Sequence, residues 1–266
     1  MSSIFIYGRP GSGKTTFAAS MTKLGYKVQF IDVDRKIKNM VNLSMGVEKE
    51  LIQVTEIDDP IDTQSLKQRA QSGLKSYPMS LPRGYLSICE TIDQLGKEDP
   101  PTEPTVLVLD SLTRVNEHMK SMLKHHCKGK LDFSGWDAVL GNYEALFDAF
   151  YSLQPNHYTH CIIIAHSKDD QDAVLQIIES RPLIDGQFRD KAGSYVEEMF
   201  FTFVDVPNKA STPKFLCYTK PTGRILHARS SRDLPVVVEQ DFGIIFEGET
   251  KKGETKNGKT TTTHRR

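Results

Sequence analysis

The chain carries the stretch Gly8-Arg9-Pro10-Gly11-Ser12-Gly13-Lys14-Thr15 close to its first residue, and this stretch fits the pattern G-x-x-x-x-G-K-[ST] without a mismatch. In that pattern the glycines let the backbone wrap around a phosphate group with its N–H groups pointing inward. The lysine reaches the outer phosphates, and the Ser or Thr hydroxyl binds Mg²⁺. An apolar run, residues 4–7, precedes the stretch, and a helix-like segment, residues 14–24, follows it. The sequence therefore predicts a nucleotide-phosphate site between a strand and a helix N-terminus.

Nine consecutive residues are the predicted nucleotide-binding set, with Mg²⁺ as the accompanying metal ion. They are Gly8, Arg9, Pro10, Gly11, Ser12, Gly13, Lys14, Thr15 and Thr16. Lys14 is also a candidate catalytic residue because its charge would lie against the outer phosphates, and Thr15 is a candidate metal ligand.

Short apolar runs continue through the first two thirds of the chain with helix-like segments between them. The runs are residues 4–7, 28–31, 105–109 and 160–165, and the helix-like segments are residues 14–24, 84–95, 112–124 and 136–153. Strands that alternate with helices and lack polar positions indicate a parallel sheet covered on both faces. Residues 198–206 and 214–219 are strand-like, and a turn at 220–223 follows them, which favours added antiparallel strands. The fold class is therefore α/β, a P-loop NTPase with a mainly parallel sheet flanked by helices and antiparallel strands added C-terminally.

The composition sets limits on partners and location. Thirty-four basic and thirty-four acidic residues leave no net charge, which excludes a nucleic-acid binder that is basic over its whole surface. We expect one domain over residues 1–248 and a disordered tail over 249–266, where six basic and two acidic residues give a net charge of +4. The apolar runs are too short to cross a bilayer, and the scattered cysteines need no oxidising compartment. We therefore expect a cytoplasmic protein with no membrane partner.

Asp110 ends the apolar run at 105–109, and this position predicts a second part of the site. A carboxylate at the C-terminal end of a parallel strand lies beside the phosphate loop, where it can hold Mg²⁺ through water. Asp110 could instead cap the following helix. After a phosphate loop of this kind we favour the role in metal binding, together with Thr15.

Known P-loop classes can be compared with these residues. A regulatory GTPase needs D-x-x-G and N-K-x-D, but this chain has Asp110-Ser-Leu-Thr113 and Asn208-Lys209-Ala-Ser211, so that class is excluded. A nucleotide kinase stays open, because Arg181, Arg189 and Lys191 could serve in an arginine-rich lid.

The segment Phe30-Ile31-Asp32-Val33-Asp34 resembles the strand of RecA-like ATPases whose last acidic residue activates the attacking water. Asp34 matches that residue, although the family usually has Glu. Asp32 and Asp34 could also cap a helix or be solvated. His166, at the end of Ile162-Ile-Ile-Ala-His166-Ser167, resembles the polar residue that senses the γ-phosphate. A plain hydrogen-bonding role at the strand end is the alternative.

The resemblance extends over about residues 1–246 to a group of phage-encoded RecA-like ATPases that includes single-strand annealing and recombination proteins. It implies an ATP-hydrolysing protein that acts on single-stranded DNA, in the host cytoplasm, as a homo-oligomer with ATP at subunit interfaces. A single-strand-binding protein is a further implied partner. In such cores, basic residues of one subunit complete the site of the next. Lys220 and Arg224 are the candidates here, and a solvated turn is the alternative.

Two segments are candidates for binding single-stranded DNA. The first, residues 124–130, is basic and lies close to Phe133 and Trp136, although we expect Trp136 to lie in the core. The second, residues 167–191, is expected to be a loop and contains Arg181, Phe188, Arg189 and Lys191. Basic groups with aromatic neighbours suit single strands. Besides the kinase, a module that anneals DNA and uses ATP only as a switch stays open, because Asp34 is shorter than the usual Glu.

Overall fold

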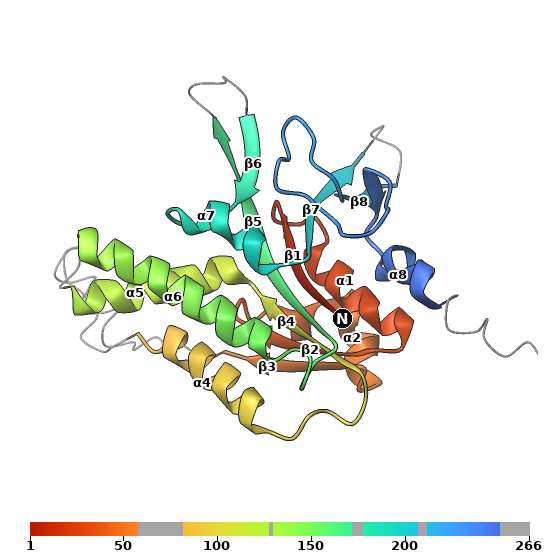
Figure 1. Cartoon of the computed structure of the whole chain (residues 1–266). Coiled ribbons are helices and arrows are strands. Elements are labelled where there is room, and N and C mark those ends of the chain that lie inside the picture. The colour runs from red at the N-terminus through yellow and green to blue at the C-terminus, as the bar shows by residue number, and fades with distance from the viewer. Residues whose placement is uncertain (58–81, 128–129, 172–177, 207–211, 251–266) are drawn as a thin grey trace, which may run out of the picture.

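A sheet with the strand order β3-β2-β4-β5-β1-β7-β8-β9 forms the centre of the protein, with β6 paired to β5 (Figure 1). This computed structural model describes residues 1–57, 82–127, 130–171, 178–206 and 212–250. Within them the strands are β1 (Ser2–Gly8), β2 (Lys27–Asp32), β3 (Ile52–Glu56), β4 (Thr105–Asp110), β5 (His160–Gln171), β6 (Ile178–Pro182), β7 (Glu198–Asp205), β8 (Lys214–Tyr218) and β9 (Val237–Glu239).

The direction of the strands confirms the predicted fold class. Strands β3, β2, β4, β5, β1 and β7 run parallel to their neighbours in this order. The β7–β8 and β8–β9 pairs are antiparallel, and so is the β5–β6 pair. Parallel strands need helical crossovers, and these crossovers cover both faces of the sheet.

Helices lie on both faces of the sheet (Figure 1). Alternate residues of the strands pack into the core on each side. Leu107 and Leu109 of β4 pack with the first face, and Val106 and Val108 with the second. The first face carries α4 (Gly84–Lys97), α5 (Leu112–His126), α6 (Phe133–Ser152) and α7 (Phe188–Lys191). The second carries α1 (Lys14–Ala19), α2 (Val41–Glu48) and α8 (Phe242–Thr250). Burial on both sides explains why the central strands lack the alternation of a half-exposed sheet.

Several elements differ from the sequence-based expectations. The expected helix at 14–24 is an α-helix only to Ala19 and continues as a 3₁₀ turn over Ser20–Leu24. The expected loop at 167–191 is wrong, because β5 extends to Gln171 and pairs with β6 before α7 begins. Strand β3 and helices α2 and α8 were not expected.

The expected tail overlaps the last helix, since α8 runs to Thr250. The remaining tail residues, 251–266, lie outside the described part of the chain. In the part that is described, no helix is both long and apolar enough to cross a membrane.

Candidate nucleotide site

The phosphate loop connects β1 to α1, and its backbone depends on glycine at two positions. Gly11 and Gly13 have φ angles of 76° and 88°, in the left-handed region that favours glycine. A Cβ atom on Gly13 would lie 2.5 Å from Oε1 of Gln240, so space also requires glycine there. The loop closes through a hydrogen bond from the Ser12 amide to the Arg9 carbonyl at 3.2 Å. The residues predicted from the motif therefore form one compact turn at the C-terminal end of β1.

The C-terminal strands support this loop from behind. The Ser12 and Thr202 hydroxyls are 2.7 Å apart and buried. Gln240 donates from Nε2 to the Ser12 and Leu216 carbonyls, both at 2.8 Å, and so connects the phosphate loop to β8. Gln240 was not recognised in the sequence, because a single Gln more than two hundred residues from the loop carries no local signal. The phosphate loop, near the start of the domain, is thus held in place by residues of the C-terminal strands.

Lys14 lies over the loop and is buried. Its ammonium donates to the Gly8 carbonyl at 2.9 Å and the Arg9 carbonyl at 2.8 Å. The Lys14 pKa is lowered to about 8, mainly by burial and in part by the nearby Lys36, against the opposing attraction of Asp110 and Asp34. Phosphate oxygens would offer this ammonium stronger acceptors than carbonyls do. The group is therefore positioned to move from the loop carbonyls to a nucleotide.

We expect a pH dependence of nucleotide binding from this lowered Lys14 pKa. As the pH rises above about 8, free protein increasingly holds neutral Lys14, and affinity for ATP falls. The fall approaches about ten-fold per pH unit until the pKa of the bound state is reached. Titrating a fluorescent ATP analogue between pH 7 and pH 10 measures it. Lys14→Arg stays charged and should give a flatter profile, whereas a flat wild-type profile would contradict the assignment of Lys14.

Thr15 and Asp110, the two predicted metal ligands, are in direct contact. The Thr15 hydroxyl donates to Oδ2 of Asp110 at 2.6 Å, and the Asp110 side chain is completely buried. Burial raises the Asp110 pKa, while Lys36 and the Thr15 hydroxyl act in the opposite direction. Within the described residues, no three His, Cys, Asp or Glu side chains gather into a metal site. These few oxygen donors fit Mg²⁺, which keeps several waters and takes other ligands from phosphates.

Asp34 lies near Asp110 at the C-terminal end of the sheet. Lys36 connects them, with its ammonium 2.7 Å from Oδ2 of Asp34 and 3.4 Å from Oδ1 of Asp110. The Ser111 hydroxyl donates to Asp34 at 3.3 Å. The capping alternative applies to Asp32, which accepts from the amides of Lys36 and Ile37 at 2.9 and 2.7 Å. Lys36 was not singled out in the sequence.

His166 follows the buried part of β5 and lies opposite Gly8 in the parallel register. Its backbone amide donates to the Thr113 hydroxyl at 2.9 Å. Within the described residues the buried Nδ1 of His166 has no hydrogen-bond partner. Burial lowers the His166 pKa, and the charge of Lys14 lowers it further. A neutral imidazole beside the phosphate lysine can donate to a phosphate group.

The candidate interface cations lie in different surroundings. Lys220 is exposed and 3.6 Å from Asp233, whereas Arg224 lines a cavity of about 590 Å³. The outer side of the phosphate loop, residues 9–12, lines the same cavity, as do the aromatic rings of Phe201 and Tyr218. Arg224 is therefore brought beside the phosphate loop of its own chain, and Lys220 does not line this cavity.

The outer residues of the predicted set have further contacts. Arg9 pairs with Asp169 of β5 at 2.5 Å, and Pro10 lines the cavity of about 590 Å³. Thr16 accepts a hydrogen bond from the side chain of Asn42 in α2 at 2.7 Å. These contacts fix the loop between β5 and α2.

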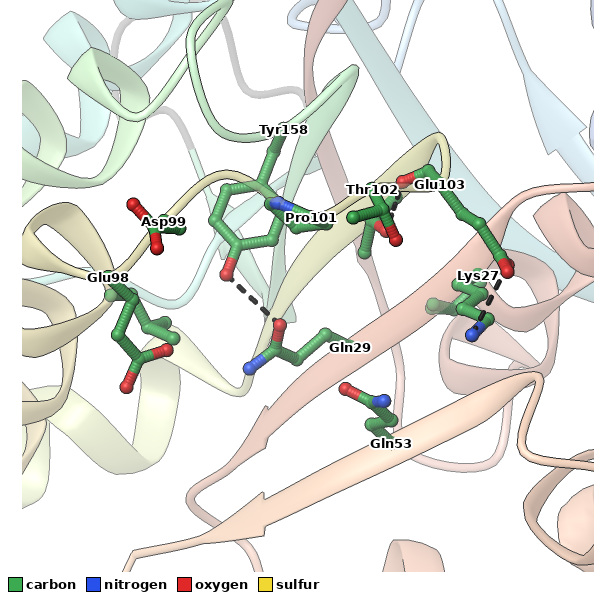
Figure 2. A pocket seen from close by; sticks show the side chains of 12 residues that line it. Lys27, Gln29, Gln53, Glu98, Asp99, Pro101, Thr102, Glu103 and Tyr158 are labelled. Carbon is green, nitrogen blue, oxygen red and sulfur yellow. Dashed lines mark hydrogen bonds and ion pairs between the residues drawn. The ribbon is translucent and has the colours of Figure 1, made fainter.

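A separate cavity of about 290 Å³ lies at the N-terminal ends of the parallel strands, on the side of the sheet away from the phosphate loop (Figure 2). Lys27 and Thr105, which begin β2 and β4, line it. Tyr158 donates its hydroxyl to Gln29 across the cavity at 3.0 Å. Parallel strands place their first residues at the edge away from the phosphate loop, so this cavity is not part of the nucleotide site.

The first predicted DNA segment retains exposed aromatic side chains. Helix α5 runs to His126, and residues 128–129 lie outside the described part of the chain. Phe133 is 90% exposed and Trp136 is 44% exposed at the start of α6. The expectation that Trp136 lies in the core is therefore wrong.

The second predicted DNA segment is occupied by internal contacts. Phe188 is completely buried and stacks on Tyr143, so it cannot stack on bases. The three cations singled out in the segment form ion pairs with nearby carboxylates: Arg181 with Glu179, Arg189 with Asp170, and Lys191 with Glu144. The described part of this segment is therefore a strand pair followed by a short helix with internal ion pairs.

Comparisons with known proteins show the family of this chain. No curated protein sequence matches the chain significantly. One solved structure, of a prototypical ATPase from the type III secretion system of pathogenic bacteria, is 15% identical and aligns with 76% of this chain at a TM-score of 0.43. This chain spans about half, 51%, of that structure's chain. Residues 2–231 match the AAA domain family, and this match covers most of the chain. The chain therefore belongs to the AAA domain family and is a P-loop ATPase domain.

Proposed function

We propose that this protein binds ATP with Mg²⁺ at the C-terminal edge of its sheet, hydrolyses it, and acts on single-stranded DNA in recombination or strand annealing. The observation that carries the nucleotide site is the 2.6 Å contact between Thr15 and Asp110 directly beside the phosphate loop. That contact joins the two residues that the motifs assign to the metal ion, although they are far apart in the chain.

The side chains around this contact have separate roles in the proposed reaction. Lys14 and the loop amides bind the phosphates, and Thr15 and Asp110 orient Mg²⁺, which neutralises phosphate charge when bound. Asp34 accepts a proton from the attacking water. His166 contacts the γ-phosphate, because it lies opposite Gly8 of the phosphate loop in the strand register.

Hydrolysis is favoured over nucleotide-kinase activity by the second candidate segment. A kinase needs cations that are free to close over the transferred phosphate. Here Arg181 pairs with a buried carboxylate, Glu179, and Arg189 pairs with Asp170. These cations are committed to the fold around the β5–β6 pair.

The proposed DNA contact lies at the junction of α5 and α6. Phe133 and Trp136 expose their rings there, and Lys124 and Lys130 lie within a few residues of this junction in the sequence. Exposed aromatic rings beside basic groups suit stacking with single-stranded bases. A homo-oligomer with ATP at its interfaces is part of the proposal, with Arg224 and Lys220 as the cations for a neighbouring site. By resemblance, a single-strand-binding protein is a further proposed partner and the host cytoplasm is the proposed location.

ATP hydrolysis measured with and without single-stranded DNA tests this proposal. We expect DNA to stimulate hydrolysis. Replacing both Phe133 and Trp136 with Ala should remove the stimulation and weaken DNA binding by about ten-fold or more, because two stacking contacts are lost. Met45→Ala, at an exposed apolar residue of α2, is the matched control. If DNA still stimulates hydrolysis by the double variant, the DNA contact lies elsewhere on the protein. Nucleotide binding with no DNA effect would contradict the proposed role in recombination.

A further inference from the structure

We propose that Lys36 is a built-in cation that takes the place of Mg²⁺ between Asp34 and Asp110 when no metal–nucleotide complex is bound. On binding of that complex, the Lys36 ammonium leaves Asp110 and releases Asp34 to act on water. This inference rests on the proposed ATPase function and adds an internal control of the same site.

The position of the ammonium supports this role. Lys36 Nζ lies 3.4 Å from Oδ1 of Asp110, while the Thr15 hydroxyl lies 2.6 Å from Oδ2 of the same carboxylate. One buried carboxylate thus has the metal-binding hydroxyl on one oxygen and a cation on the other. The same ammonium lies 2.7 Å from Asp34. A single positive charge therefore links the metal ligand to the proposed water-activating residue.

The backbone of the turn after β2 directs Lys36 back into the site. Arg35 has a φ angle of 56°, an uncommon left-handed conformation for a residue other than glycine. Asp32 holds the next turn by accepting from the amides of Lys36 and Ile37. Lys38, two residues further, pairs instead with Glu56 of β3 at 3.3 Å. The turn separates two neighbouring lysines, one directed to the site and one away from it.

Two cations cannot share these carboxylates without strong repulsion. A magnesium ion near Thr15 and Asp110 would carry two charges close to the ammonium. Asp110 is completely buried whereas the Lys36 side chain is 39% exposed, so water screens the repulsion between the two cations only in part. Lys36 must then give up its contact with Asp110. Because it also pairs with Asp34, the same movement frees Asp34. Binding of the metal ion at Thr15 and Asp110 and release of Asp34 from Lys36 are therefore coupled.

Direct metal binding without nucleotide tests the proposal, with Mn²⁺ as the probe and electron paramagnetic resonance of free Mn²⁺ as the readout. Wild type should bind Mn²⁺ weakly. Lys36→Met, which keeps the length and removes the charge, should bind it about ten-fold more tightly or better, whereas Lys36→Arg should resemble wild type. Lys38→Met is the matched control and should change nothing. Melting temperature gives a second readout: Mg²⁺ without nucleotide should stabilise Lys36→Met more than wild type.

Two outcomes would overturn the inference. Unchanged or weaker Mn²⁺ binding by folded Lys36→Met would show that the ammonium does not compete with the metal. Tight Mn²⁺ binding by nucleotide-free wild type would also show that the Lys36 ammonium does not compete with the metal. This measurement does not depend on the folding of a variant. Failure of the proposed function is distinguishable, because wild type would then bind no ATP even with Mg²⁺ present.

Discussion

Lys14→Ala should lower the affinity for ATP by about a hundred-fold or more, because it removes a charged donor to the outer phosphates. The fold should survive. The ammonium is buried, and its lowered pKa shows that burial of its charge opposes the protonated form. The substitution leaves the Gly8 and Arg9 carbonyls without this donor but removes a desolvated charge. Equilibrium titration with a fluorescent ATP analogue, together with a melting curve, separates loss of binding from loss of fold.

Lys23→Ala is the matched control for Lys14→Ala. Lys23 lies in the 3₁₀ turn that continues α1, and its exposed ammonium pairs with Asp241 at 2.5 Å. Exposed ion pairs contribute little to stability, so this variant should bind ATP as wild type does. Equal affinity of wild type and Lys14→Ala would mean that the phosphate loop does not bind the nucleotide.

Asp34→Asn should slow ATP hydrolysis by about a hundred-fold or more and leave ATP affinity within about three-fold of wild type. An amide cannot accept the proton of the attacking water, whereas the phosphate and metal contacts belong to other residues. Single-turnover hydrolysis beside equilibrium binding measures the two effects separately. Because Asp32 accepts two amide hydrogen bonds of the following turn, Asp32→Ala should instead lower the melting temperature.

Asp34→Glu gives the opposite test at the same position. The longer side chain reaches further toward the phosphates, as the glutamate of RecA-like proteins does, so this variant should hydrolyse ATP at least as fast as wild type. Normal hydrolysis by Asp34→Asn would place the proton acceptor elsewhere. If wild type and Asp34→Glu both bind ATP without hydrolysing it, ATP serves as a conformational switch.

The parts of the fold that could be predicted are those with strong local signals. The phosphate loop is a contiguous motif, and β4 and the first part of β5 are unbroken apolar runs that can only be buried. Strand β3 (Ile52–Glu56) escaped prediction because it is short, lies at the sheet edge and alternates polar with apolar residues. Helix α2 has only one buried residue, Leu43, and hence no clear apolar face.

The unpredicted features of the site depend on distant contacts or on backbone conformation. Lys36 reaches the carboxylates because Arg35 takes a left-handed conformation that no sequence pattern signals. We expected Trp136 in the core and Phe188 in an exposed loop, but Trp136 is exposed and Phe188 is buried. Both are aromatic residues in polar surroundings, and Phe188 is buried because it packs against Tyr143 and Phe147 of α6 and against Tyr195. Local sequence carries no information on that packing.

The contact between Gln240 and the phosphate loop has a consequence for biosynthesis. Within this domain the loop is translated more than two hundred residues before Gln240 and before Phe242, whose ring stacks on Phe17 of α1 with a centroid distance of 4.4 Å. Domains generally fold as units during synthesis. A nascent chain that stops before residue 240 therefore lacks this part of the loop's support, although Thr202 is already present to contact Ser12. The complete support of the phosphate loop forms only late in the translation of the domain.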